Sequence, residues 1–241
     1  RLMSAAARAH ALAHIGVQRL FDLPFNAALA ALTPLEFAQH VLSDGLGAAH
    51  VTVGADFNFG KGRAGRAQDL ADLGAQFGFG VTIAEMVADQ GAEMSSTAIR
   101  AALTAGNPSL AAQMLGHPHS FEGPVIHGHK RGRELGYPTA NMDISGLHLP
   151  RFGVYAVRVA VLNGPHIGQY IGAASLGIRP MFGENQPNLE TYIFDFTGDL
   201  YGADISVSLI EFLRDEAKFD GLPALMAQMA DDCARARRVL T

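Results

Sequence analysis

The sequence predicts two folds in one chain: a parallel α/β domain over residues 1–116, followed by an antiparallel β-barrel or sandwich over residues 117–241. Two observations support this division. Helical and extended segments alternate as far as Gly116, which is typical of a parallel sheet with crossover helices. From Ser120 onward, short strand-like runs follow one another across Gly, Pro and Asn turns without an intervening helix, which favours a barrel or sandwich.

In the first half, helices are expected where capping residues precede apolar spacing. Ser4 is expected to cap a helix that extends to His14, and Thr33, Pro34 and Glu36 have the spacing of a capping box with proline at the first helical position. The other predicted helices are Leu70–Phe77, Ser95–Ala105 and Leu110–Leu115. The predicted strands are Leu20–Pro24, His50–Gly54 and Val81–Met86.

In the second half, alternating and β-branched residues predict strands, and a final apolar stripe predicts a helix. The predicted strands are Pro124–Ile126, Gly153–Leu162, Ile167–Ser175, Leu189–Phe196 and Ile205–Phe212. The helix is expected from Leu222 to about Leu240. Its apolar face is expected to contain Leu222, Leu225, Met226, Met229 and Cys233.

Composition limits the partners. The chain has a net charge of −5, with 49% hydrophobic and 17% charged residues, so no global basic field attracts nucleic acid or an anionic membrane. We therefore expect small-molecule substrates, with a homo-oligomer as the one protein partner to consider. The single cysteine, Cys233, excludes an intramolecular disulfide and favours a reducing, cytoplasmic location.

Residues 127–141 form the most informative motif, because they combine glycines, positive charge and two short side chains that carry oxygen. Glycine lets a backbone approach a ligand closely, and Lys and Arg suit phosphate. The basic residues are Lys130, Arg131 and Arg133. Pro138 restricts the backbone, so Thr139 and Asn141 are expected to be held in position, where a hydroxyl and an amide oxygen can complete the coordination of Mg²⁺. The motif predicts a site for a nucleoside triphosphate.

The stretch from Gly60 to Gly65 matches the dinucleotide pattern G-x-G-x-x-G, with Glu85 twenty residues further on. That pattern requires its first glycine directly after a strand, and here five residues separate it from Gly54. A surface loop is therefore favoured over a nicotinamide or flavin Rossmann site. A third interpretation is an aromatic wall with a carboxylate for a flat heterocycle, made by Asp56, Phe57 and Phe59.

Two further positions have a functional and a structural interpretation. Ser95, Ser96 and Thr97 open a helix that carries Arg100, which describes either a phosphate site at a helix N-terminus or a plain capping cluster. Glu190 opens a strand, where it could accept a proton from an attacking hydroxyl or be an exposed strand residue.

Taken in order along the chain, these segments resemble the bifunctional riboflavin kinase/FMN adenylyltransferases, the prokaryotic FAD synthetases. The resemblance extends over essentially the whole chain. The matching segments are Val53–Gly60, Ser95–Arg100, Gly123–Asn141, Gly153–Val157, Leu176–Pro180, Glu190, Asp195–Gly202 and Leu213–Phe219. It implies a nucleotidyltransferase-type α/β domain, here incomplete at its start, and a small β-barrel kinase domain with a C-terminal helix.

The resemblance also implies roles for individual residues. Thr139 and Asn141 would hold Mg²⁺ and ATP phosphates, and Glu190 would be the base for the ribityl 5′-hydroxyl of riboflavin. The loop from Gly128 to Gly136, with Lys130 and Arg133, would cover the nucleotide. Ser96 and Arg100 would contact ATP phosphate in the first domain. The residues expected to bind flavin are Asp56, Phe57, Phe59, Arg214 and Phe219.

Two departures from the family pattern affect these expectations. The family's Gly-x-Phe-Asp-x-x-His-x-Gly-His motif has no match here, and Met181 stands where threonine is common. Without the motif's histidines, adenylylation by this chain is expected to fail, while phosphorylation of riboflavin to FMN remains. The rival interpretations are a flavin-binding module without catalysis and a nicotinamide-dependent oxidoreductase.

Incubation of this chain with FMN, ATP and Mg²⁺ should therefore yield almost no FAD, because no histidine pair stabilises charge on the transferred nucleotidyl phosphate. Chromatographic separation of FMN from FAD measures the product. Accumulation of FAD as fast as FMN forms from riboflavin would contradict this expectation.

Overall fold

The computed structural model describes the chain except for residues 86–87, 90–91, 129–131, 133–134 and 182–183. Its contacts form two compact units. One unit contains Arg1–Gln18 together with Met94–Thr241, and the other contains Arg19–Glu93. The helices α1 (Ala5–His14), α5 (Ser96–Thr104) and α6 (Pro108–Leu115) therefore belong to the same compact unit as the C-terminal strands.

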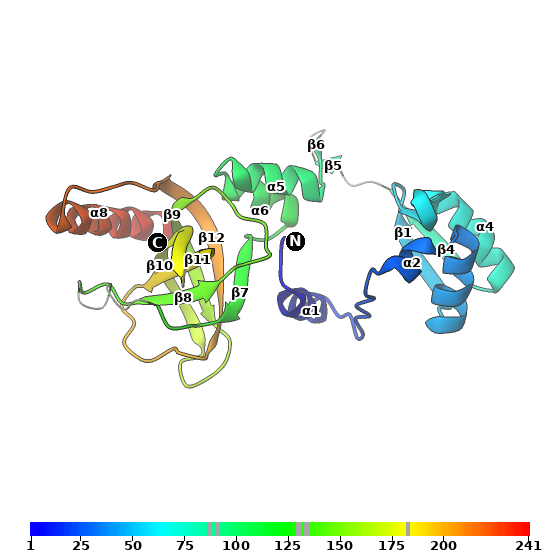
Figure 1. Cartoon of the computed structure of the whole chain (residues 1–241), viewed down its shortest axis with the longest axis horizontal. Helices are drawn as coiled ribbons and strands as arrows, with labels where there is room; N and C mark the ends of the chain where they lie inside the picture. Colours follow the sequence, from blue (N-terminus) through cyan, green and yellow to red (C-terminus); the bar gives the residue numbers. More distant parts are fainter. Residues whose placement is uncertain (86–87, 90–91, 129–131, 133–134, 182–183) are drawn as a thin grey trace. The chain divides into compact units, whose positions relative to one another are not determined.

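Six antiparallel strands make a nearly closed barrel in the first unit (Figure 1). Their order in the sheet is β7-β12-β9-β10-β11-β8. Their bounds are β7 (Ser120–Pro124), β8 (Thr139–Asp143), β9 (Gly153–Val161), β10 (Gly168–Met181), β11 (Glu184–Ile193) and β12 (Asp204–Asp215). A bridge between Ile126 and Asn141 brings the end of β7 against β8, the strand at the other edge of the sheet. The antiparallel barrel is thereby confirmed over the sandwich.

The barrel has a core on each side of its wall. Inside, fully buried side chains such as Tyr155, Leu189 and Leu209 fill the lumen. Outside, helix α8 (Leu222–Leu240) packs on β9, β10 and β12, and buries a second cluster that includes Ala236 and Leu240. Strand β9 is consequently buried on both faces along most of its length, which explains its continuous apolar sequence.

The C-terminal helix has the predicted bounds, but its buried face differs from the prediction. Leu222 and Met226 are exposed, whereas Ala236 and Leu240 near the C-terminus are buried. The reason is that only the C-terminal half of α8 packs closely on the barrel, while its first half borders a cavity.

The helices of the first half of this unit follow the sequence signals. The Ser4 hydroxyl accepts a hydrogen bond from the backbone N–H of Ala7 at the start of α1, as predicted. Helices α5 and α6 share a small apolar core centred on Leu103 and Ala111, and α6 packs against β12. Helix α1 contacts β7, where His10 Nδ1 lies 3.2 Å from a Glu122 carboxylate oxygen.

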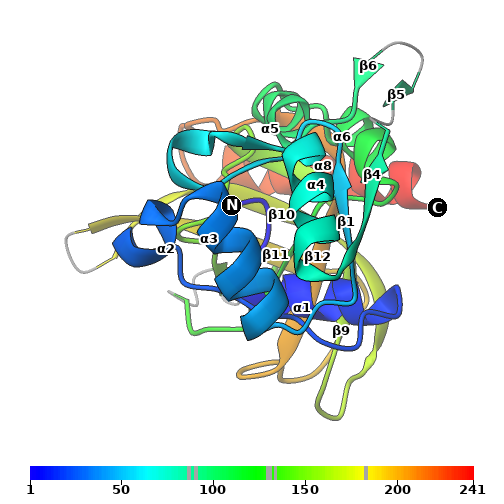
Figure 2. The ribbon, with the colours of Figure 1, turned by 90° about the vertical axis from the view of Figure 1, so that its right-hand side faces the viewer.

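The Arg19–Glu93 unit is a small α/β structure. Strands β1 (His50–Gly54) and β4 (Gly80–Ala84) pair in parallel, and α4 (Ala67–Phe77) packs on β4 (Figure 2), which confirms the predicted parallel α/β character. The predicted capping box at Thr33 is present. The other elements are α2 (Ala27–Ala31), α3 (Pro34–Glu36), the π-helix η1 (Phe37–Gly45), β2 (Asn58–Phe59), the 3₁₀ turn η2 (Lys61–Arg63), β3 (Gly65–Arg66), β5 (Ala88–Asp89) and β6 (Ala92–Glu93).

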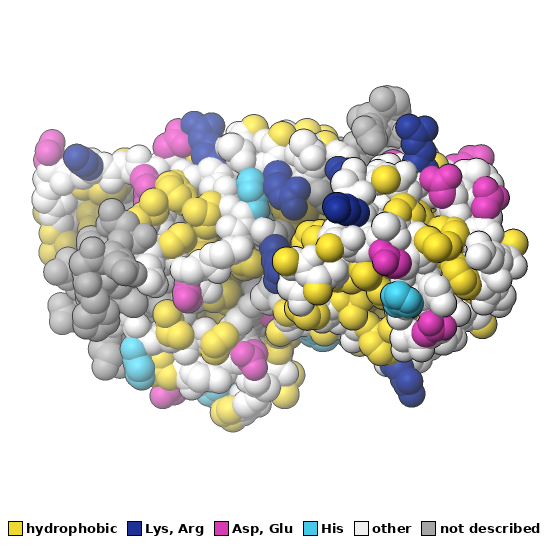
Figure 3. Space-filling model, turned by 45° about the vertical axis from the view of Figure 1, so that its right-hand side comes forward, with side chains coloured by type: hydrophobic (Ala, Val, Ile, Leu, Met, Phe, Trp, Pro, Cys, Tyr) yellow, Lys and Arg dark blue, Asp and Glu magenta, His cyan; other side chains and the backbone are white. Residues whose placement is uncertain are grey.

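Several predicted elements are wrong or displaced. Leu20–Pro24 is not a strand, because its apolar side chains are exposed and its backbone pairs with no described strand. Exposed apolar side chains are frequent over the face of the Arg19–Glu93 unit drawn in Figure 3. Strand β11 begins and ends earlier than predicted, and Asp195 lies in the following turn with a left-handed φ of 56°. Strand β8 was not predicted, since its Pro-Thr-Ala-Asn sequence is typical of a loop.

The G-x-G-x-x-G match from Gly60 to Gly65 does not form a dinucleotide site. Gly60 directly follows β2, Gly62 lies in the 3₁₀ turn η2 and Gly65 begins β3, which pairs with β2 in antiparallel, and α4 starts only at Ala67. The strand before Gly60 therefore leads into a single 3₁₀ turn and a second antiparallel strand, whereas pyrophosphate binding requires a strand that leads through the glycines into an α-helix.

His119 is a buried titratable residue that directly precedes β7. Its side chain is 3% exposed, and its Nε2 atom has no hydrogen-bond partner among the described residues. Burial is the main reason that the pKa of His119 falls from 6.5 to about 4, and the nearby His148 and His117 contribute to the decrease. The folded barrel therefore holds this imidazole in its neutral form.

The barrel should lose stability as the pH falls from 6.5 toward 4, because the unfolded chain then binds a proton at His119 that the folded state rejects. The loss expected from this group is about 3 kcal/mol in the free energy of unfolding. All five tyrosines lie between residues 137 and 201 and the chain has no tryptophan, so tyrosine fluorescence during urea unfolding reports on the barrel. His119→Leu should flatten this pH dependence, whereas substitution of the exposed His14 should not. An unchanged slope in His119→Leu would contradict the assignment.

Candidate active site

The pairing of β8 with β11 brings together two predicted site residues that are far apart in the sequence. Glu190 lies directly opposite Asn141, and Tyr192 lies opposite Thr139. Residues directly opposite in an antiparallel pair share a face, with Cβ atoms about 5 Å apart. The alternate residues Met142 and Leu189 fill the barrel core. The polar group therefore lies on the outer face of the barrel wall.

A cavity of about 370 Å³ lies over this outer face, between the strands, the first half of α8 and the segment that follows β12. Four predicted site residues line it, which are Thr139, Glu190, Arg214 and Phe219. Much of the remaining wall is apolar. The other lining residues are Gly132, Leu135, Tyr137, Val154, Ala173, Ala174, Ser175, Tyr192, Glu216, Ala217, Leu225, Met229, Asp232 and Cys233.

A second cavity, of about 270 Å³, lies at the barrel end where β8 begins. Thr139 lines both cavities, so this residue stands at their boundary. The turn after β11 supplies most of the remaining wall. The lining residues are Val125, Pro138, Thr139, Ala140, Thr191, Ile193, Phe196, Thr197, Gly198, Asp199, Leu200 and Tyr201. Two adjoining cavities of this size suit two ligands that meet at Thr139.

Asn141 is buried, and hydrogen bonds to Thr139 and Asn188 hold its side-chain amide on two sides. Its Nδ2 donates to the Thr139 carbonyl oxygen at 3.2 Å and to Thr139 Oγ1 at 3.4 Å, while its Oδ1 accepts from Asn188 Nδ2 at 3.2 Å. An amide's oxygen and nitrogen are assigned from such a network. This network sets Nδ2 toward Thr139, so coordination of a cation by Oδ1 beside Thr139 Oγ1 would require the amide to turn over and to give up its bonds to the Thr139 carbonyl oxygen and to Asn188.

Two neutral oxygens make a weak cation site by themselves. Mg²⁺ usually keeps several waters and takes substrate phosphates as ligands, so this pair fits a cation that arrives on a triphosphate. Within the described part of the chain, no cluster of three or more His, Cys, Asp or Glu side chains could hold a metal ion independently.

The glycine-rich segment before β8 approaches the site closely. A Cβ atom on Gly128 would lie 2.6 Å from Asn141 Nδ2, so only glycine fits there without displacing that amide. The Gly132 carbonyl oxygen accepts from Tyr137 N at 2.7 Å, which folds the segment back onto the start of β8. Gly136 has a φ of 82°, in the left-handed region. The predicted phosphate ligands Lys130 and Arg133 lie outside the described residues.

Tyr192, Glu216 and Asp232 line the larger cavity but were missed by the sequence analysis. Tyr192 could have been found, because it follows Glu190 by two positions and therefore shares its face. Burial raises the pKa of Tyr192, so its phenol stays protonated. Cys233 was expected in the core and packs against the outer cluster; burial raises the pKa of its thiol to about 11, which makes it a poor nucleophile.

The predicted residues of the first domain fall in different units. Asp56, Phe57 and Phe59 belong to the Arg19–Glu93 unit, where the rings of Phe57 and Phe59 stack with centroids 5.6 Å apart. Phe59 is buried in the core of that unit. Ser96 and Arg100 lie on α5, which belongs to the barrel's unit. Their roles in binding remain predictions.

Hydrogen bonds within the segment cap the start of α5. The Ser95 hydroxyl caps the helix by accepting from Ala98 N, and Arg100 Nη1 donates to the Ser96 carbonyl oxygen at 3.1 Å. The interpretation of this segment as a capping cluster is therefore confirmed, and phosphate binding there stays a prediction.

Comparison with known proteins identifies relatives of both halves of the chain. A family model described as riboflavin kinase matches residues 115–240, and one described as FAD synthetase matches residues 1–98. A Pseudomonas fluorescens protein named bifunctional riboflavin kinase/FMN adenylyltransferase is 40% identical over 92% of this chain and 70% of its own length. The Escherichia coli K12 protein of the same name is 38% identical, over 94% of this chain and 71% of its own length.

A solved structure is similar over nearly the whole chain. It is named a macrolide-efflux protein from Streptococcus pneumoniae, is 34% identical, and superposes with a TM-score of 0.82 over 98% of this chain and 75% of that one. In the part of the chain that the structure describes, no helix has both the length and the apolar character needed to cross a membrane.

Gly128→Ala should weaken nucleotide binding by about tenfold, because the new Cβ would push Asn141 out of position and small misplacements of positioning groups are costly. Calorimetric titration with a non-hydrolysable Mg²⁺–ATP analogue measures the affinity. Gly123→Ala is the matched control, since its Cβ would meet only Met142, at an ordinary 3.7 Å. Equal affinities in the two variants would contradict a role for this close approach.

Proposed function

The chain belongs to the bifunctional riboflavin kinase/FMN adenylyltransferase family, and on that premise we propose that Glu190 and Thr139 form the centre at which its C-terminal half phosphorylates riboflavin with ATP. The single observation that supports this centre is the shared position of Thr139. It lines the cavity that contains Glu190 and also lines the adjoining cavity at the barrel end.

We assign the larger cavity to riboflavin. Its wall combines aromatic and apolar side chains with a small number of polar groups, which is the composition expected around a flat heterocycle with a polar tail. Phe219, Leu225 and Met229 offer the apolar surface for the ring system. Glu190 lies on the strand wall of the same cavity, where the ribityl chain would end.

We assign the smaller cavity to the terminal phosphates of ATP. Its wall includes Thr139, Thr197 and Pro138, and Pro138 follows the glycine-rich segment from Gly128 to Gly136 by two positions. Phosphoryl transfer depends mainly on positioning and on neutralising charge on the transferred group. Mg²⁺, held by Thr139 and Asn141 together with the phosphates, would supply that neutralisation when bound.

In the proposed reaction, the ribityl 5′-hydroxyl oxygen forms a bond to the γ-phosphorus, and the bond from this phosphorus to the bridging oxygen of ADP breaks. The hydroxyl proton passes to the Glu190 carboxylate. Asn141, directly opposite Glu190 in the β8–β11 ladder, fixes the distance between the proton acceptor and the phosphate-binding edge.

The rival interpretations differ in what they predict. A flavin-binding module without catalysis would bind riboflavin and release no ADP. A nicotinamide-dependent oxidoreductase needs a dinucleotide motif, and the turn between β2 and β3 lacks its geometry. For the first half of the chain we propose FMN adenylylation as a property of the full-length protein, with a cytoplasmic location and a homo-oligomer as further proposals.

Glu190→Gln should lower kcat by about 10²- to 10⁴-fold, the contribution expected of a general base, because an amide cannot accept the hydroxyl proton. The KM for ATP should change little, since the substitution preserves shape. Coupled detection of ADP release and chromatographic detection of FMN measure the rate.

The matched control is Glu211→Gln, which removes an exposed carboxylate from β12. It should retain the wild-type kcat. A Glu190→Gln enzyme with unchanged kcat would remove Glu190 from the mechanism, whereas absence of ADP release from the wild type would refute the kinase assignment itself.

A further inference from the structure

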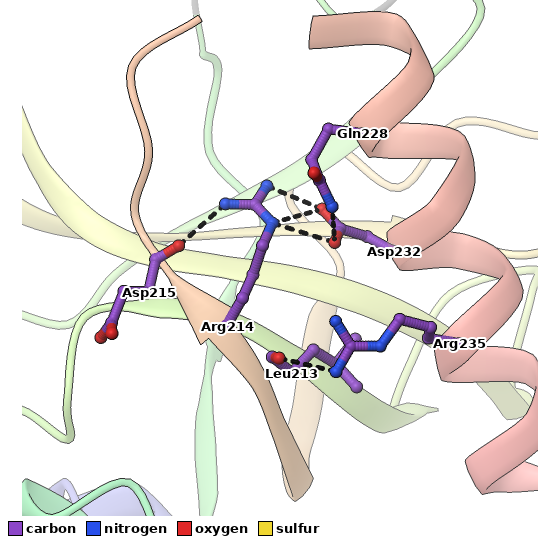
Figure 4. A network of polar contacts seen from close by, with 6 residues as sticks. All are labelled: Leu213, Arg214, Asp215, Gln228, Asp232 and Arg235. Atoms are coloured by element: carbon purple, nitrogen blue, oxygen red, sulfur yellow. Dashed lines mark hydrogen bonds and ion pairs between the residues drawn. The ribbon is translucent and has the colours of Figure 1, made fainter. Parts of the chain in front are cut away.

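A buried ion pair links α8 to the end of β12 beside the larger cavity (Figure 4). Arg214 Nε donates to both carboxylate oxygens of Asp232, at 2.9 and 3.0 Å, and Arg214 Nη2 donates to Oδ2 at 2.7 Å. Gln228 Nε2, one turn earlier on α8, donates to Asp232 Oδ1 at 3.0 Å. The Asp232 side chain is only 5% exposed, so its charge is enclosed and fully hydrogen-bonded.

A contribution to folding stability does not by itself explain a buried ion pair of this kind. Removing two charges from water costs several kcal/mol per ion, and apolar side chains of similar volume are often equally stable. The same helix already has an apolar anchor in Ala236 and Leu240. The position of the pair, on the wall of a ligand cavity, indicates that it fixes an orientation there.

Arg214 transmits this orientation to the segment that follows β12. Its remaining terminal nitrogen, Nη1, donates to the Asp215 carbonyl oxygen at 2.8 Å, and its guanidinium carbon lies 5.6 Å from the centroid of the Phe219 ring. This segment supplies Glu216, Ala217 and Phe219 to the cavity wall. The guanidinium therefore has Asp232 on one edge, the Asp215 backbone on another and an aromatic ring within cation–π range.

We propose that Asp232 is a positioning residue for flavin binding: through Arg214, it fixes the Phe219 ring and residues 215–219 against the flavin cavity. This inference rests on the proposed assignment of that cavity to riboflavin. Asp232 acts through Arg214 and has no part in phosphoryl transfer. Thr139, Asn141 and Glu190, the groups assigned to that transfer, lie on β8 and β11, whereas these hydrogen bonds join the end of β12 and the residue that follows Arg214 to α8.

Loss of the Asp232 charge should weaken riboflavin binding but leave the rate of turnover nearly unchanged. In Asp232→Asn, the side chain keeps its shape but loses the charge and half of its acceptor capacity, so Arg214 is no longer fixed. The KM for riboflavin and its dissociation constant should rise by about tenfold, the size expected when a hydrogen-bonded charge pair is broken. The kcat at saturating riboflavin should stay within about twofold of the wild type, because Glu190 keeps its position.

Two controls separate positioning from a general loss of structure. Asp195→Asn breaks the exposed ion pair between Asp195 and Arg237, which also joins α8 to the barrel, and should leave the riboflavin KM unchanged. In a Phe219→Leu background, Asp232→Asn should cause little further increase in KM, because the ring that the network orients is already absent.

The decisive measurements are steady-state kinetics with varied riboflavin and titration of the flavin's own fluorescence in the absence of ATP. The titration tests the inference independently of catalysis, so a failure of the kinase assignment would appear as missing ADP release in the wild type instead. A lower kcat and melting temperature with unchanged riboflavin affinity in Asp232→Asn would overturn the proposal, and so would full additivity with Phe219→Leu.

Discussion

The pairing register of β8 with β11 is the constraint on which the rest of the site depends. It sets Glu190 opposite Asn141, and side chains alternate along strands, so a slip of one residue would turn Glu190 into the barrel lumen. Apolar burial fixes the register from the other face, where Met142 and Leu189 belong to the core. A backbone hydrogen bond from Ile126 N to the Asn141 carbonyl oxygen, at 2.8 Å, fixes the outer edge of β8 as well.

The sequence predicted the kinds of residue at this site better than their arrangement. Thr139 and Asn141 could be found because a glycine-rich basic loop next to proline is unusual, and Glu190 because it stands at a strand. Their meeting could not be predicted from spacing, since Glu190 lies 49 positions after Asn141 and only the β8–β11 pairing joins them. Resemblance to a family supplied that information, which local physics did not.

The failures of sequence-based prediction have a common physical origin. Leu20–Pro24 has the apolar composition of a strand, but a strand also needs a hydrogen-bonding neighbour, and that requirement is invisible in a local window. Asp232 was missed for a related reason. Two adjacent acids on a helix, Asp231 and Asp232, predict a solvated surface, and only the position of β12 beside α8 supplies the Arg214 partner that permits burial of Asp232.

The two proposed tasks of the site are supported by different parts of the unit. The groups assigned to phosphoryl transfer lie on neighbouring strands of one continuous sheet, whose relative positions are set by backbone hydrogen bonds and by the core beneath them. Of the groups assigned to flavin binding, Leu225 and Met229 lie on α8, and Phe219 lies on an irregular segment, which has no ladder to hold it and would depend on Arg214 and Asp232 instead. Under the proposed assignment, helix α8 would serve both stability and binding: its C-terminal half completes the outer core through Ala236 and Leu240, while its first half lines the cavity.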